Sequence, residues 1–313
     1  MTALAPLAPA GGLTEAREPA PPAGGAKSRL GILVVPALLM FLGFAFIPLI
    51  GVLVLSFTDW NGISAINFVG GQSWQQTLTD PETWHALWLT FALMICTWVV
   101  QTPISLLLGT FIAGQQRYRA LLGVLFFLPL LMSSAAIAIA FKSLLDPNFG
   151  LSAGLHMPFL AQDWLGDPTL AFITVVFVIA WQFVPFHTLL YQGGVRQIPE
   201  QLYEASQIDG AGRVRQFFSI TVPQLKYTII TSSTLMLVGS LVYFDLIWVL
   251  TQGGPGNATR ILALDMYITG FQANQMGAAS VIGVILVVVG LALTIIIQRL
   301  GGRDLRASQM EGM

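Results

Sequence analysis

The sequence predicts an all-α, polytopic membrane protein, and three observations lead to that fold class. Hydrophobic residues make up 55% of the chain and charged residues only 9%, whereas about 25% are charged in ordinary soluble proteins. Six long apolar runs are each able to cover a hydrocarbon core of about 30 Å as a helix. Basic residues lie almost entirely between alternate runs, which is the pattern of a chain that crosses a membrane repeatedly.

The first apolar run, 31–58, follows a tail made mostly of alanine, proline and glycine. Residues 1–28 lack a cluster of large apolar side chains, so we expect a disordered cytoplasmic tail. The run itself is too long for the core of a signal peptide, and no usual cleavage site follows it, so we expect it to remain as the first spanning helix. Pro36 and Pro48 inside it predict kinks that neighbouring helices would accommodate.

Five further spanning helices complete a predicted six-helix domain that extends over residues 29–300, before a second cytoplasmic tail at 301–313. Asp245 is the one ionisable residue that we place inside a span. The five helices are expected near 86–113, 120–141, 169–192, 227–250 and 277–298.

The connections at 59–85 and 143–168 are predicted to face outward. Both contain acidic residues, and the first also contains three tryptophans, which suit the interface between lipid and water. Cys96 lies in an apolar run, so disulfide bonding is excluded and a buried, unreactive thiol is expected.

The positions of lysine and arginine predict the orientation, because both residues are retained on the cytoplasmic side. Only Lys142 and Arg260 fall on the opposite side. Both termini and the polar loop 193–226 are therefore expected in the cytoplasm. The residues on that side are Arg17, Lys27, Arg29, Arg117, Arg119, Arg196, Arg213, Arg215, Lys226, Arg299, Arg303 and Arg306.

The loop 193–226 is the longest polar interruption in the second half of the chain, and its pattern predicts a helix, a turn and a second helix. Pro199 stands where a helix takes its first residue, and Gly210 stands where a left-handed residue ends one. The second helix is expected to end at Pro223. The apolar residues that repeat at helical spacing in the first helix are Leu202, Ala205 and Ile208.

Two stretches of the sequence carry a family resemblance. YEASQIDGAGRVRQFFSITVP resembles the EAA loop in the membrane subunits of ATP-driven, binding-protein-dependent importers, with Ser206 in place of the second alanine. FDLIWVLTQGGPGNATR, at 244–260, is similar to the carbohydrate-uptake branch, that of the larger permease of the maltose transporter. The motif positions that match the coupling element of these importers are Glu204, Ala205, Ser206, Asp209, Gly210 and Ala211.

The resemblance implies a permease subunit in a prokaryotic inner membrane, working by alternating access. Its implied partners are a second homologous permease, a homodimeric cytoplasmic ATPase that docks on the coupling helix, and an extracytoplasmic sugar-binding protein that touches the loop around 253–276. This chain contains no phosphate-binding loop, so ATP and Mg²⁺ would bind to the ATPase and the chain itself is not expected to be an enzyme. No basic patch of a nucleic-acid-binding protein is present.

Alignment with the resembled maltose permease implies a substrate site on the helices before and after the EAA loop. Phe183 replaces a glycine of that permease, so the pocket would have a different shape. Asp245 would face a cavity or reach the membrane surface, and each aligned residue would serve equally well in helix packing. The residues implicated are Gln182, Phe183, Phe186, Met236, Ser240, Tyr243 and Asp245.

The substrate expected from these residues is a neutral sugar, because hydroxyl, amide and aromatic groups suit sugars and no basic residue lies inside any span. Two alternatives remain open at the level of sequence. One is an importer of the same kind for a phosphorylated polyol, a peptide or another small solute. The other is an ion-coupled secondary transporter, which inverted repeats or several intramembrane carboxylates would favour, and neither feature is found in the sequence.

Overall fold

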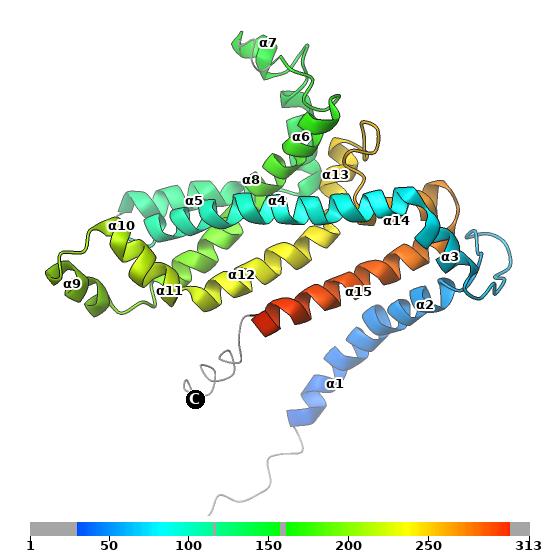
Figure 1. Ribbon diagram of the computed structural model, residues 1–313, viewed down its shortest axis with the longest axis horizontal. Helices are drawn as coiled ribbons and strands as arrows, with labels where there is room; N and C mark the ends of the chain where they lie inside the picture. The colour runs from blue at the N-terminus through cyan, green and yellow to red at the C-terminus, as the bar shows by residue number, and fades with distance from the viewer. Residues whose placement is uncertain (1–29, 115–116, 157–160, 301–313) are drawn as a thin grey trace, which may run out of the picture. The chain divides into compact units, whose positions relative to one another are not determined.

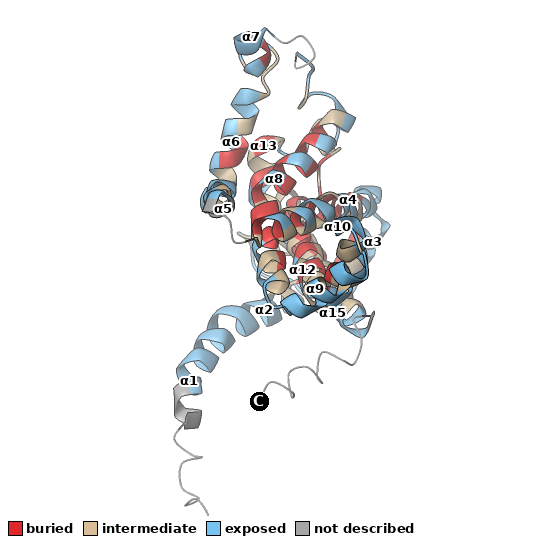
Figure 2. Ribbon diagram, turned by 90° about the vertical axis from the view of Figure 1, so that its left-hand side faces the viewer, coloured by how far each residue is buried: buried red, intermediate tan, exposed pale blue. Residues whose placement is uncertain are grey.

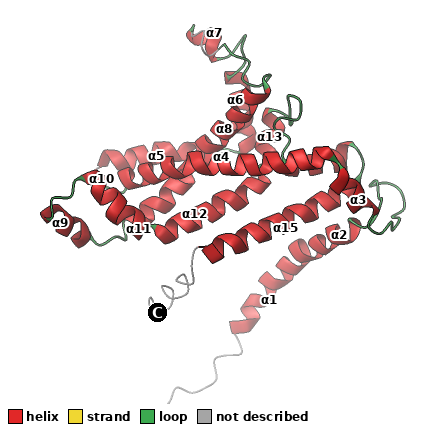
Figure 3. Cartoon of the chain, in the orientation of Figure 1, coloured by secondary structure: helices red, strands yellow, loops and turns green. Residues whose placement is uncertain are grey.

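The structure, a computed structural model, describes residues 30–114, 117–156 and 161–300, and within them the chain is helical (Figure 3). An isolated antiparallel bridge between Thr58 and Phe68 is the only strand-like pairing in these ranges. The predicted tails at 1–28 and 301–313 lie outside the described residues. The chain divides into two units, 1–49 and 50–313.

The first unit contains α1 (Leu30–Phe41) and a π-helical turn at 42–46, after which α2 (Ile47–Leu55) continues into the second unit. In the π-helical turn the amide of Ile47 donates to the carbonyl of Leu42. This wider turn comes directly before Pro48, whose ring removes one helical hydrogen bond. The stretch Val34–Leu55 is long and apolar enough to cross a membrane, as predicted for the first run.

Three long helices of the second unit are also long and apolar enough to span a membrane. Two of them begin at an Asp-Pro pair, because Asp80 accepts a hydrogen bond from the amide of Glu82, and Asp167 accepts bonds from the next two free amides of its helix. The first of these helices therefore starts more than a turn earlier than the sequence pattern suggested. The three are α4 (Pro81–Ile112), α8 (Pro168–Val195) and α15 (Met276–Leu300).

The run predicted as one helix at 120–141 is interrupted, so that expectation of a continuous span is wrong. It forms α5 (Arg117–Leu131) and α6 (Ser134–Leu144), which meet at an angle of 95°. Pro129 lacks an amide hydrogen, and the side chain of Ser133 begins the new helix by accepting a hydrogen bond from the amide of Ala136 at 3.2 Å.

The run predicted at 227–250 is interrupted as well. α12 (Lys226–Gly239) ends in a 3₁₀ turn at 240–242, and after Tyr243 a separate helix, α13 (Phe244–Leu250), begins. Before α12, a helix formed by α10 (Arg213–Gln216), a π-helical turn and α11 (Val222–Gln224) passes through Pro223 and bends by 70° at Leu225.

The described chain therefore has four uninterrupted helices that could cross a membrane, or up to six spans if each bent pair forms one. The shorter helices lie at the ends of the long ones. In Figure 1, α9, α10 and α11 lie at one end of α4 and α12, whereas α3 and α14 lie at the opposite end. The bounds of these and the remaining short helix are α3 (Gln72–Thr79), α7 (Leu151–Leu155), α9 (Glu200–Ile208) and α14 (Leu262–Tyr267).

The core of the second unit is built around α4 and α8, and Figure 2 shows the buried residues concentrated along α8. The two helices approach closely at Gly109, where a Cβ atom would lie 2.7 Å from the Cβ of Tyr191. Fully buried apolar side chains such as Leu93 and Ile179 fill the contact. Cys96, predicted to be buried, is exposed on α4 and therefore has to be replaced in any labelling experiment.

Candidate functional site

The loop at 193–226 contains the predicted helix–turn–helix unit. α9 follows Pro199, which caps the helix instead of forming its first residue. Gly210 has a φ of +74°, the left-handed conformation expected of it, and its amide donates to the carbonyl of Gln207 at 3.0 Å. The amide of Ala211 donates to the carbonyl of Ser206 at 2.9 Å, which completes the end of the helix.

The motif residues of this loop lie on its surface. No residue of α9 is buried. Ile208 keeps 87% of its surface exposed, and Leu202 on the same helix is exposed too, so the apolar face predicted for this helix has no cover from the described part of the chain. Of the matched motif residues, Glu204, Ala205, Asp209 and Gly210 are exposed, whereas Ser206 and Ala211 are half-buried.

Side-chain hydrogen bonds connect α9 to the helix that follows it. The hydroxyl groups of Tyr203 and Thr221 lie 2.9 Å apart. The amide nitrogen of Gln216 donates to the hydroxyl oxygen of Ser206 at 2.9 Å, and that hydroxyl donates to the carbonyl of Tyr203 at 2.8 Å. The serine that replaces alanine in the motif thus makes contacts that an alanine could not make.

The second helix of the loop joins α12 at a buried corner. Leu225, at the 70° bend, is 1% exposed and packs where a Cβ atom on Gly194 would lie 2.7 Å from its side chain. The amide of Ile229 donates to the carbonyl of Leu225 at 2.8 Å, so hydrogen bonding continues across the corner. α12 is therefore attached at this end to both the loop and the last turn of α8.

The other end of α12 borders a cavity of about 370 Å³, a size within the usual range of small-molecule pockets. The two interrupted spans meet there, because Ser134 follows the break between α5 and α6 and Tyr243 lies at the break between α12 and α13. Interrupted helices beside a cavity are a feature of membrane transporters, since the freed backbone groups lie away from lipid.

The cavity brings together four of the seven residues that the resemblance implicated. Phe183 and Phe186 of α8 line it with Tyr243 and Asp245. The rings of Phe183 and Tyr243 lie 5.2 Å apart between centroids, with planes inclined by 32°. Asp245 is exposed and occupies the first turn of α13, beyond the helix break instead of inside an uninterrupted span.

The remaining three implicated residues are buried behind the lining. Gln182 donates from its amide nitrogen to the hydroxyl of Ser134 at 3.0 Å. Ser240 donates to the carbonyl of Leu237 at 2.7 Å, and the sulfur of Met236 accepts a bond from Thr102 at 3.4 Å. In this structure each of the three supports neighbouring groups and does not line the cavity.

Several lining residues were not found from the sequence. Ser134 comes from the break after α5, and the pair Ser133-Ser134 after Pro129 was the available signal for a helix cap there. His187 lines the cavity beside Phe186, and its Nδ1 lies 2.9 Å from the hydroxyl of Ser232 on α12. The other lining residues are Leu130, Leu235, Gly239, Val242 and Leu246.

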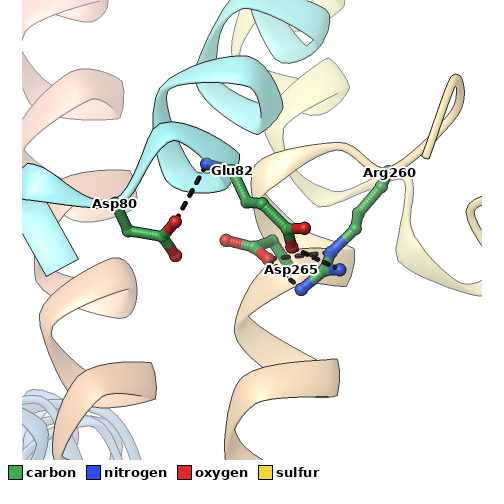
Figure 4. A network of polar contacts seen from close by, with 4 residues as sticks. All are labelled: Asp80, Glu82, Arg260 and Asp265. Atoms are coloured by element: carbon green, nitrogen blue, oxygen red, sulfur yellow. Dashed lines mark hydrogen bonds and ion pairs between the residues drawn. The ribbon is translucent and has the colours of Figure 1, made fainter. Parts of the chain in front are cut away.

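At the opposite end of the molecule from α9, a polar network joins α4, α14 and the loop between α13 and α14 (Figure 4). Arg260 donates to Glu82 at 3.0 Å and pairs with Asp265 at 2.6 Å. Burial raises the pKa of Asp265, and the nearby Arg260 opposes that rise. In the same loop, Gly253 and Gly256 have φ values of +89° and +57°, a backbone conformation that favours glycine.

Comparison with known proteins identifies the family that the chain resembles. The model of the family described as "Binding-protein-dependent transport system inner membrane component" matches residues 101–307. The multiple sugar-binding transport system permease protein MsmF of Streptococcus mutans is 31% identical over 261 residues, which cover 82% of this chain and 89% of that protein. The trehalose/maltose transport system permease protein MalF of Thermococcus litoralis is 29% identical over 279 residues, with 88% and 94% covered.

Solved structures agree with the fold. A chain of a bacterial alginate ABC transporter, crystallised in complex with its alginate pentasaccharide-bound periplasmic protein, aligns with a TM-score of 0.77 at 22% identity and covers 88% of this chain and 94% of that one. The family model matches more than half of the sequence. The matched range contains both interrupted spans and the exposed loop at 193–226. The chain therefore belongs to the family of inner membrane components of binding-protein-dependent transport systems.

Proposed function

We propose that the chain forms part of the translocation path of an ATP-driven importer of neutral oligosaccharides. The observation that carries the proposal is the cavity at the junction of two interrupted spans, connected through α12 to an exposed loop at the other end. The complex would contain a second homologous permease, a homodimeric cytoplasmic ATPase and an extracytoplasmic sugar-binding protein. Relatives named for multiple sugars, trehalose/maltose and arabinooligosaccharides support a sugar as substrate.

The chemistry of the cavity favours a neutral sugar. The hydroxyls of Ser134 and Tyr243 would bond sugar hydroxyls, and the rings of Phe183 and Phe186 would pack against the apolar faces of sugar rings. None of the lining residues is lysine or arginine, and Asp245 would repel an anionic ligand. Gln182 would act indirectly, by fixing the hydroxyl of Ser134.

α9 would be the docking site for the ATPase. Its exposed Leu202 and Ile208 provide an apolar surface for a cleft in the ATPase, and Glu204 and Asp209 add charged groups beside it. ATP and Mg²⁺ would bind to the ATPase, so hydrolysis belongs to that partner chain. Closure of the ATPase dimer would move α9, and alternating access at the cavity would follow.

The proposed orientation places α9 in the cytoplasm and the network of Arg260 outside. Basic residues flank α9 in the chain, in keeping with their retention on the cytoplasmic side: Arg196 follows α8, Arg213 and Arg215 belong to α10, and Lys226 begins α12. Both termini would be cytoplasmic in this orientation.

Thiol labelling tests this orientation. In a Cys96→Ser background, Gln201→Cys is expected to react with a membrane-impermeant maleimide only when the reagent reaches the cytoplasmic face. Thr79→Cys, at the exposed last residue of α3, is expected to react from outside in intact cells. The readout is the labelled fraction in whole cells and in inverted vesicles. Reversal of the two patterns would contradict the orientation and, with it, docking of a cytoplasmic ATPase on α9.

A further inference from the structure

Hydrogen bonds connect α9 to the helix that follows it. None of the residues of α9 is fully buried, and the two that make side-chain bonds to the next helix, Tyr203 and Ser206, are half-buried. Three side-chain hydrogen bonds join α9 to the helix that follows it: the pair Tyr203–Thr221, the pair Ser206–Gln216, and a longer bond of 3.5 Å from the amide nitrogen of Gln216 to the carbonyl of Tyr203. We call the two shorter pairs the clasp. Each pair joins one residue of α9 to one residue of the helix running from 213 to 224.

The two pairs of the clasp are spaced so as to restrain the direction of α9 relative to the helix that follows it. On α9, Tyr203 and Ser206 lie three residues apart, and therefore on one face of that helix. Their partners Gln216 and Thr221 lie five residues apart on the following helix. Two directional bonds at separate points restrain the angle between the two helices more than either bond alone would, because each bond has its own distance and angle to satisfy.

The clasp is continuous with the buried end of α12. Thr221 is 5% exposed, and its carbonyl accepts a bond at 3.0 Å from the amide of Leu225, the residue at the bend. From there α12 runs to Gly239 and the 3₁₀ turn, and Gly239 and Val242 line the cavity. A displacement of α9 therefore has a connected route to the cavity through the clasp and α12.

We propose that Tyr203, Ser206, Gln216 and Thr221 are positioning residues that make α9 and the 213–224 helix move as one body. The inference rests on the proposed function, because it assumes that an ATPase moves α9. Loss of the clasp would leave the ATPase bound to the exposed side of α9. Its closure would then turn α9 about the connection at Gly210, where open space surrounds the backbone, and would no longer move α12.

The test uses the whole complex, purified through an affinity tag on this chain, with Cys96→Ser and a reporter cysteine, Val242→Cys. Val242 lines the cavity and is 73% exposed. The labelling rate of this cysteine by a hydrophilic maleimide is measured without nucleotide and after trapping with Mg-ATP and vanadate. The parent complex is expected to show a change of roughly threefold or more between the two states, as its cavity changes exposure.

In complexes carrying Thr221→Val, Tyr203→Phe or Gln216→Ala, the ATPase is expected to co-purify and to trap nucleotide as in the parent, while the change in labelling of Val242→Cys disappears. The double variant Tyr203→Phe/Thr221→Val is expected to lose no more than either single variant, because the two groups form one bond. Thr221→Ser keeps the hydroxyl and is expected to keep the change. Gln207→Ala, which alters an exposed glutamine of α9 outside the clasp, is the matched control.

Two results would contradict the proposal that the clasp makes the two helices move as one body. One is a normal change in labelling in Thr221→Val and Gln216→Ala. The other is loss of the ATPase from these variants, which would mean that the bonds only shape the docking surface. The proposed function fails in a different way. In that case the parent complex itself shows no dependence on nucleotide, or Leu202→Asp, on the exposed face of α9, retains the ATPase at the parental level.

Discussion

Replacing Gly210 with proline is expected to reduce ATP hydrolysis stimulated by the substrate-loaded binding protein to its basal rate, with the chain still inserted in the membrane. Gly210 has a φ of +74°, whereas the ring of proline holds φ near about −65°. Proline also removes the amide that donates to the carbonyl of Gln207 at 3.0 Å. The end of α9 would have to unwind, and the helix would lose the direction in which it meets the ATPase.

A matched control lies two residues away. Gly212 has a φ of −72° and extended geometry before α10, so Gly212→Pro fits the backbone and is expected to keep stimulation. A Cβ atom on Gly210 would lie in open space, but φ there is positive, and that conformation costs about 1 kcal/mol in a non-glycine residue. Gly210→Ala is therefore expected to keep an intermediate level of stimulated ATP hydrolysis. Full stimulation in Gly210→Pro would show that this loop is not the coupling element.

Replacing Tyr243 with alanine is expected to lower the rate of sugar uptake by about tenfold or more, which corresponds to about 1.4 kcal/mol or more of lost binding to the sugar during transport. The change removes both a hydroxyl at the cavity and the ring that packs against Phe183 at 5.2 Å. Basal ATP hydrolysis should persist, because α9 and its surroundings are untouched. Initial rates of uptake in proteoliposomes, beside ATP hydrolysis in the same preparation, provide the measurement.

Two further variants separate the contributions at this position. Tyr243→Phe keeps the ring and is expected to lose only the part of the uptake that depends on the hydroxyl. Phe177→Ala removes an exposed ring of α8 that does not line the cavity and is expected to transport normally. Normal uptake by Tyr243→Ala would show that Tyr243 serves helix packing and does not bind the sugar.

The ends of helices were largely predictable from sequence, because they depend on local chemistry. Gly210 takes the left-handed conformation that its position after α9 suggested. The starts of α4 and α8 depend on Asp80 and Asp167, each followed by proline. These Asp-Pro pairs are ordinary signals of a helix start, and attention to apolar runs alone placed the start of α4 too late.

The interruption of the run at 120–141 was not predicted, because hydropathy averages over the residues that cause it. The stretch 120–141 is uncharged throughout, yet it turns by 95° after Pro129, where Ser133 caps the next helix. At 240–243 no proline is present, but the small residues Gly239 and Ser240 are of the kind found where membrane helices are broken or kinked, and the 3₁₀ turn begins at Ser240.

The candidate site was predictable only in part for the same reason. Phe183, Phe186 and Tyr243 were found through the family resemblance and Asp245 through its charge inside a predicted span, and the structure brings all four to one cavity. Ser134 is 48 residues from its partner Gln182, and the clasp joins Ser206 to Gln216 across a turn. Such pairings depend on how helices pack, so the sequence indicated the residue types without indicating which of them meet.

Uptake by the purified complex in proteoliposomes tests the central claim most directly. A radiolabelled trisaccharide of neutral glucose units and one of uronic acids are supplied with the binding protein on one side, and ATP is supplied on the side of the ATPase. The account predicts accumulation of the neutral trisaccharide that requires ATP, persists without any ion gradient and exceeds that of the acidic one. Uptake driven by an ion gradient without ATP, or preference for the uronic acids, would contradict it.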